Sequence, residues 1–284
     1  MNTSDTSRRA RRAIVGAVAI TLLAASTLWA HDLFLRLEDY FVQPDSDIRI
    51  HVLNGTFSKS EGPVARNRLR SLDLVTGSDA IKLDTSAWVP RGDSTTLTIH
   101  TGAAGTYVAA ASLLPRSIAI GAKDFNTYLR TDGVPDMLAK RRRDGTLDVP
   151  AKELYQKHVK AVFQVGTSRT AGFDRVLGYP AELVPLANPY ELRPGAALRV
   201  RALVDGQPVA NQFVVWGGRT PKGARIAQRS TRTDSSGVAR ITPLPPGIWY
   251  VKFIHMVPAP AGDTVNYHSK WATLTFAVAP RGTR

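Results

Sequence analysis

The chain contains no cysteine among its 284 residues. Disulfide bonds are therefore excluded, and with them the small disulfide-stapled folds that are common among exported proteins. Thiolate ligands are excluded as well, so a bound metal ion would need histidine, carboxylate, methionine or backbone donors. Methionine is also scarce, with three residues. A chain of this length must be held together by its own hydrophobic core.

Several functional signatures are missing too. No hydrophobic run after residue 30 reaches the length of about 20 residues that a membrane-spanning helix needs. The sequence has no Gly-x-Ser-x-Gly nucleophile elbow, no phosphate-binding loop and no His-Glu-x-x-His zinc motif. No RNA-binding, zinc-finger or helix-turn-helix pattern is present, so nucleic acid is not an expected partner. These absences favour a protein that is not an enzyme.

The chain begins with an apparent export signal over residues 1–30. Residues 1–12 carry four arginines, the stretch that follows is uncharged and mostly apolar, and Ala30 is small. This order is typical of a secretory signal peptide. Cleavage after Ala30 would make His31 the first residue of a mature periplasmic protein. Cleavage after Ser26 is an alternative, and an uncut segment would act as an N-terminal anchor.

The rest of the chain is basic. Removal of the signal lowers the formal charge from +14 to about +11. A basic protein outside the cytoplasm meets anionic lipid head groups or acidic glycans rather than nucleic acid. The densest basic cluster, residues 140–143, is interpreted as a solvated helix end.

Period-two alternation of apolar residues predicts an all-β fold. We expect an N-terminal β region over 31–120, then a short helical insertion and a connecting strand over 121–178. A C-terminal β-sandwich is expected over 179–284, where strands recur every 8–12 residues with turn residues between them. The segment 153–165 fits either a strand or a helix, and we favour a strand.

The six histidines separate by their phase within the predicted strands. Residues two apart share one face of a strand. Three histidines lie at strand ends on the same predicted face as apolar residues: His31, His255 and His268. The other three lie on the same predicted face as polar residues and are interpreted as having no functional role: His51, His100 and His158.

The first three could share one metal ion. His255 and His268 fall near the same end of a predicted hairpin, where directly opposed Cβ atoms lie about 4.5–5.5 Å apart. An N-terminal His31 would add its α-amine and its imidazole. Asp263 and Met256 are further donors, and such a set suits nickel, copper, zinc or cobalt. The alternative is that two strand-end histidines only bind loop backbone.

Collinear segments across nearly the whole mature chain resemble a family of exported bacterial proteins of unassigned function. That family is often described as a nickel-uptake, substrate-specific component similar to NikM. The matching segments are 31–35, Gly55-Thr56-Phe57, 153–161, 183–190, 233–237, 247–249, His255-Met256 and 269–276.

The resemblance implies a C-terminal part like the transthyretin or carboxypeptidase-regulatory β-sandwiches. By position it carries over His31, Asp32, His255 and His268 as metal-site residues, and it favours nickel or cobalt. True NikM-type permease components cross the membrane several times, and this chain has no suitable run after residue 30. It would therefore act as a periplasmic partner of a metal transporter or of another envelope protein.

Three functional hypotheses result. The leading one is a non-enzymatic periplasmic protein that binds a divalent transition metal for uptake, delivery or buffering. The second is a β-sandwich interaction module that binds an anionic glycan or an envelope protein through its basic surface. The third is an oxidative copper enzyme built on the N-terminal histidine.

Overall fold

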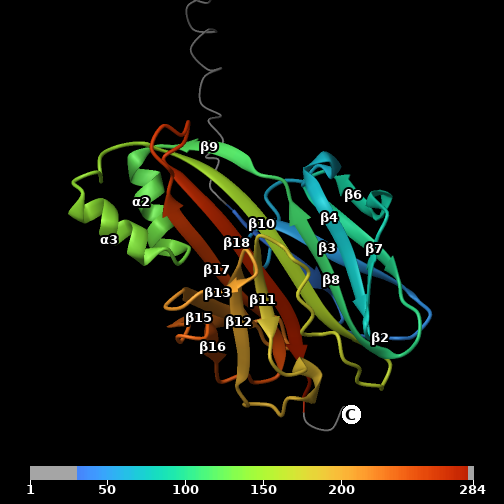
Figure 1. Cartoon of the computed structure of the whole chain (residues 1–284). Helices are drawn as coiled ribbons and strands as arrows, with labels where there is room; N and C mark the ends of the chain where they lie inside the picture. Colours follow the sequence, from blue (N-terminus) through green and yellow to red (C-terminus); the bar gives the residue numbers. More distant parts are fainter. Residues whose placement is uncertain (1–30, 281–284) are drawn as a thin grey trace, which may run out of the picture. The chain divides into compact units, whose positions relative to one another are not determined.

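The computed structural model describes residues 31–280 (Figure 1). The predicted signal peptide, residues 1–30, lies outside the described residues. The chain from His31 onward belongs to one compact unit. Its strands form three sheets.

The largest sheet, here the central sheet, has ten strands in the order β15-β14-β17-β18-β10-β8-β4-β5, with β2 and β9 also paired to β10. The bounds of its strands are β2 (Phe41–Val42), β4 (Leu69–Thr76), β5 (Asp79–Lys82), β8 (Gly105–Leu113), β9 (Arg116–Ile120), β10 (Ala151–Val165), β14 (Phe213–Arg219), β15 (Arg225–Arg232), β17 (Gly247–Pro258) and β18 (Tyr267–Val278).

Two smaller sheets pack on the central one. The first has the order β1-β3-β7-β6. Its strands are β1 (Asp32–Leu37), β3 (Asp47–Gly55), β6 (Trp88–Arg91) and β7 (Ser94–His100). The second has the order β11-β12-β13, with β16 also paired to β12. Its strands are β11 (Ala181–Pro185), β12 (Leu198–Val204), β13 (Gln207–Pro208) and β16 (Val238–Ile241).

The small sheets lie against opposite faces of the central sheet. Thr273 and Thr275 of β18 donate hydrogen bonds from their hydroxyls to backbone carbonyls of β1. Lys160 of β10 instead reaches Glu182 of β11, and it pairs in register with Leu274. We call the face that bears Thr273 the β1 face and the face that bears Leu274 the β11 face.

The central strands follow from their sequences. The segment 153–165, which fitted a strand or a helix, is part of strand β10. This strand runs parallel to β18 and antiparallel to β8 and β9. Every residue of β8 is buried, as expected for an uninterrupted apolar run covered on both faces. β17 and β18 form the predicted antiparallel hairpin. The prediction of an all-β fold with a short helical insertion is confirmed.

The helical insertion consists of α2 (Ala122–Thr131) and α3 (Pro135–Arg143). Figure 1 shows both helices beside the end of β17 and β18, where Tyr128 of α2 stacks on Trp271 of β18 at a centroid distance of 5.6 Å. None of the helices within residues 31–280 is long and apolar enough to cross a membrane.

The interpretation of residues 140–143 as a solvated helix end is wrong for Arg141. Arg141 is only 2% exposed. Its guanidinium donates to Asn126 Oδ1 at 3.0 Å, to the Tyr267 hydroxyl at 3.0 Å and to the carbonyl of Val149 at 2.7 Å. A continuous basic run cannot reveal this, because helical geometry turns one of four consecutive side chains inward. Arg141 ties α3 to α2 and to β18.

Strands from both predicted β regions share the central sheet. β4, β5 and β8 come from the N-terminal region, and β14, β15, β17 and β18 from the C-terminal one. β10 lies between the two groups. One hydrophobic cluster accordingly contains residues of both regions.

Candidate functional site

His255 and His268 lie on the same face of the β17–β18 hairpin, as their phase predicts. They are diagonal neighbours, since His255 pairs with Lys270 and His268 pairs with Val257. Each imidazole has its own partner. His255 Nδ1 lies 3.0 Å from Gln212 Oε1, and His268 Nε2 lies 2.8 Å from Asp263 Oδ2.

His31 lies on the other side of the central sheet. The side chain of Lys157, which pairs in register with Trp271 on the β1 face, donates a hydrogen bond to the His31 carbonyl. His255 and His268 belong to the β11 face, because they alternate with residues of the β1 face along their strands. The structure therefore does not bring the three imidazoles together. Across residues 31–280 no group of three or more His, Asp or Glu side chains is arranged to hold a metal ion.

The imidazole of His31 contacts a carboxylate instead. Its Nε2 lies 3.1 Å from Glu61 Oε2. Burial lowers the pKa of His31, and the opposing effect of Glu61 does not restore it. The ring is therefore neutral at pH 7. Two lone pairs would repel each other across this contact, so the proton belongs on Nε2 and the lone pair on Nδ1.

A tight turn after β3 positions Glu61. The amide of Glu61 donates to the carbonyl of Asn54 at 2.9 Å, which folds the loop back onto the strand. A Cβ on Gly55 would lie 2.5 Å from the carbonyl oxygen of Lys59, so only glycine fits there. Gly55 thus permits the approach of Glu61 to His31.

Asp32 is held by a buried lysine from β17. Its Oδ2 lies 2.5 Å from Lys252 Nζ, and the same nitrogen lies 3.4 Å from Asp132 Oδ1. Burial alone would lower the pKa of Lys252, but the two carboxylates outweigh it and raise that pKa. Burial also raises the pKa of Asp132 to about 6. The other carboxylate oxygen of Asp32, Oδ1, is buried and has no hydrogen-bond partner in the part of the chain that the structure describes.

A second buried lysine, Lys157, holds the backbone of His31. Besides the His31 carbonyl, its Nζ approaches Asn54 Oδ1 at 3.4 Å. The ammonium lies 5.2 Å from the ring centroid of Tyr155 and 5.3 Å from that of Trp271. Burial lowers the pKa of Lys157 to about 8.

Glu153 completes the charged cluster on the β1 face. Its Oε1 accepts hydrogen bonds from the Ser269 hydroxyl and, at 3.2 Å, from the Tyr128 hydroxyl. Its Oε2 is buried without a hydrogen-bond partner among the described residues. Burial raises the pKa of Glu153 despite those hydrogen bonds.

The first two described residues thus lie against a cluster of ionisable side chains, of which Glu153, Lys157 and Lys252 are buried. The N-terminal cluster is defined here as His31, Asp32, Glu61, Asp132, Glu153, Lys157 and Lys252. Buried charges are costly and add little net stability. Strongly perturbed ionisable groups gathered in one place are typical of functional sites.

Comparison with known proteins gives the family. The model of a domain of unknown function, DUF4198, matches residues 28–257. The chain belongs to the DUF4198 family. The matched part contains His31, Asp32, Lys157, Lys252 and His255, and it ends before His268.

Other comparisons say little about the DUF4198 chain. No curated protein matches it significantly. Among solved structures, the D0-D1 domain of intimin is 13% identical, with a TM-score of 0.21, over 87% of this chain and 98% of that one. A DUF4785 family protein from Legionella pneumophila is 10% identical, with a TM-score of 0.25, over 78% of this chain and 50% of that one. TM-scores this low carry no argument.

Sequence reasoning missed the two lysines of the N-terminal cluster in this DUF4198 chain. Both share the phase of mostly apolar neighbours: Lys157 alternates in step with Tyr155 and Val159, and Lys252 with Tyr250 and Ile254. A charged residue in the apolar phase of a strand was the signal that could have found them, because buried lysine is rare.

The interpretation of His158 as a polar-face residue is wrong. It is 2% exposed, its Nδ1 lies 2.9 Å from Ser112 Oγ, and burial lowers its pKa to about 3. Alternation alone could not show this, because β10 is covered on both faces over most of its length.

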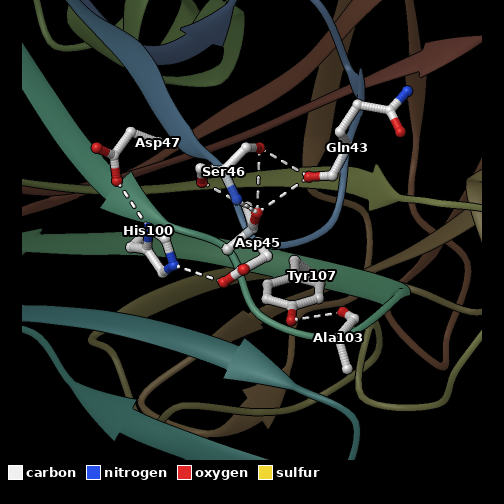
Figure 2. Close-up of polar contacts among 8 residues, drawn as sticks. Gln43, Asp45, Ser46, Asp47, His100, Ala103 and Tyr107 are labelled. Atoms are coloured by element: carbon white, nitrogen blue, oxygen red, sulfur yellow. Dashed lines mark hydrogen bonds and ion pairs between the residues drawn. The ribbon is translucent and has the colours of Figure 1, made fainter.

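His100 does lie on the surface, but it contacts two carboxylates. Figure 2 shows the ring between Asp45 and Asp47, with Nε2 3.0 Å from Asp45 Oδ1 and Nδ1 2.8 Å from Asp47 Oδ1. Hydrogen bonds to Asp47 and Asp45 raise the pKa of His100. When protonated, the ring forms ion pairs with both carboxylates and links the start of β3 to the end of β7.

Proposed function

We propose that this DUF4198 protein is exported and binds a divalent transition metal ion through an N-terminal His31. Cleavage after Ala30 would free the α-amine of His31. That amine and Nδ1 of the same residue can close a six-membered chelate ring on one ion. The contact between His31 Nε2 and Glu61 carries the proposal.

The contact matters because it suits ligation through the opposite ring nitrogen. A carboxylate at one imidazole nitrogen fixes the tautomer and leaves the lone pair on the other. The lowered pKa of His31 favours the neutral ring that ligation requires. Lys157 and Lys252 would hold residues 31 and 32 in place, with Asp32 engaged by Lys252 rather than free as a ligand.

Two nitrogen donors suit nickel and copper better than magnesium or calcium. Resemblance to the nickel-uptake family favours nickel or cobalt among the transition metals. The proposed role is uptake, delivery or buffering in the periplasm, with a metal transporter or another envelope protein as recipient. No catalytic step is proposed.

A one-residue extension tests this proposal. Protein that begins at His31 and protein that retains Ala30 would be titrated with nickel by calorimetry. We expect one equivalent of nickel to bind the first protein. Retention of Ala30 converts the amine to an amide, so affinity should fall by more than the roughly 10–100-fold typical of losing an outer-shell partner.

Two further variants locate the site. Glu61→Ala should weaken nickel binding by roughly 10–100-fold. His268→Ala is the matched control, because His268 also pairs with a carboxylate, at 2.8 Å, but on the other face of the sheet. Equal affinity of the two N-terminal forms, or a loss confined to His268→Ala, would contradict the proposal.

The basic surface supports a second candidate, the binding of an anionic glycan or envelope protein. Arg199 and Arg240 are exposed and directly opposed across β12 and β16, although like charges in this position repel. An anionic partner would relieve that repulsion. Such binding should weaken with added salt and should not respond to chelators. Nickel binding should be abolished by chelators and should depend much less on salt.

A further inference from the structure

A pocket of about 220 Å³ lies at the edge of β17, and none of its lining residues belongs to the N-terminal cluster. The start of α3 and the segment 209–213 form its walls. His255 and both methionines of the described chain, Met137 and Met256, line it.

The pocket exists because β14 ends before β17 does. The pairing of the two strands stops at Val214 with Phe253, so within the described chain β17 has no paired strand on that side beyond Phe253. Consecutive residues of a strand point to opposite faces. At an open edge nothing separates those faces, and His255 and Met256 both line the same pocket.

Gln212 fixes the tautomer of His255. The Gln212 amide nitrogen donates to the carbonyls of Phe213 and Ile254, both at 3.1 Å. The amide oxygen must then accept from His255 Nδ1, which lies 3.0 Å away. His255 Nε2 therefore keeps its lone pair. A metal ligand is commonly oriented by such an outer hydrogen bond.

The carboxylate in this pocket is already engaged. It belongs to Asp136, which binds Arg232 through both oxygens at 2.7 and 2.8 Å. The remaining strong donors are one imidazole nitrogen and two thioether sulfurs. Thioethers are soft ligands that select Cu(I) over divalent ions such as nickel.

We propose that this pocket binds Cu(I) through His255 Nε2 and the sulfurs of Met137 and Met256. The proposed ligands include no residue of the N-terminal cluster. This site also assigns His255 a role that does not depend on His31 or His268.

Silver(I), a redox-inert probe of the same softness, tests the site. Protein that retains Ala30 should be used, because this form blocks the N-terminal chelate and isolates the pocket. With methionine methyl groups labelled with ¹³C, we expect one equivalent of Ag(I) to shift the signals of both Met137 and Met256. Unshifted methyl signals at saturating Ag(I), or a shift of only one, would overturn the proposal.

Variants then assign the ligands, with Cu(I) affinity measured anaerobically by competition with a chromogenic chelator. Met137→Leu and Met256→Leu keep side-chain volume, and His255→Asn keeps a donor toward Gln212. Each should weaken Cu(I) binding at least about tenfold, and thermal unfolding would check that each variant is folded. His268→Ala should have no effect. Unchanged affinity in the three ligand variants would contradict the site, whatever the outcome for nickel.

Discussion

Two buried lysines, three residues apart on β10, serve opposite faces of the central sheet in different ways. Lys160, on the β11 face, lies 2.5 Å from Glu182 Oε2, and both side chains are almost wholly buried. Glu182 also accepts hydrogen bonds from the amides of Leu177 and Tyr179. Lys157, on the β1 face, has no carboxylate within hydrogen-bonding distance among residues 31–280, and it holds the backbone of His31.

This difference indicates that the β11 face has a structural role and that the β1 face carries the candidate functional site. On the β11 face the buried charge of Lys160 is neutralised by Glu182, which also binds the backbone of the loop that precedes β11. On the β1 face the ionisable groups are only partly paired, and within residues 31–280 two acidic oxygens, on Asp32 and Glu153, have no hydrogen-bond partner. Buried charge that is not locally neutralised lowers stability, so its presence beside residues 31 and 32 indicates a role other than stability.

The largest expected effect is on the β11 face. Lys160→Met leaves Glu182 buried and unpaired, which should lower the free energy of unfolding by about 3–5 kcal/mol. Urea denaturation of the variant and the wild type measures this. Adding Glu182→Gln to Lys160→Met should recover part of the loss, and failure of the double variant to recover any would show that the pair is not the cause.

The same substitution on the β1 face should cost far less. Lys157→Met replaces an incompletely paired buried cation with an apolar side chain of similar length, so the free energy of unfolding should change by about 1 kcal/mol or less. The same urea series measures it. A loss as large as that of Lys160→Met would show that the two faces do not differ.

Lys157 also predicts a pH dependence. Its folded pKa of about 8 lies below its ordinary value of 10.5. Between those pH values the unfolded chain binds more protons than the folded one, so this residue makes stability rise with pH from about 8 to 10.5. Melting temperatures at pH 7.5 and 9.5 should show a smaller rise in Lys157→Met than in the wild type. An identical rise in the two proteins would contradict the assignment.

The smallest effect is expected at the surface. The raised pKa of His100 means that its contribution is fully present below its ordinary value of 6.5 and is lost as pH rises through the folded value. His100→Gln should therefore lower the melting temperature slightly at pH 5.5 and leave it unchanged at pH 9. Salt should reduce the difference at pH 5.5, because the three side chains are exposed.

Local pattern predicted much of this fold. Alternation identified the β17–β18 hairpin and placed His255 and His268 on one face, because both properties depend on neighbouring residues. It could not place His31, since that depends on which face of the central sheet β1 covers. β10 inserts between β18 and β8, far apart in sequence, and no short-range pattern encodes that order.

The site was predicted in part for the same reason. The prediction that His31 and Asp32 belong to a metal site rested on the signal junction and the resemblance. Their partners come from distant elements: Lys157 from β10, Lys252 from β17 and Glu61 from the turn after β3. Only the phase of the two lysines hinted at burial, and nothing in the sequence linked Glu61 to His31.

Imidazole ¹⁵N spectroscopy of protein that begins at His31 tests the central claim most directly. The chain has six histidines, so each can be followed during titration with Zn²⁺, a diamagnetic probe. In the metal-free protein we expect the His31 proton on Nε2. On addition of Zn²⁺, His31 Nδ1 should shift, while the rings of His268 and His100 stay unchanged. Binding that shifts His268 together with His255, or that leaves His31 unchanged, would contradict the account.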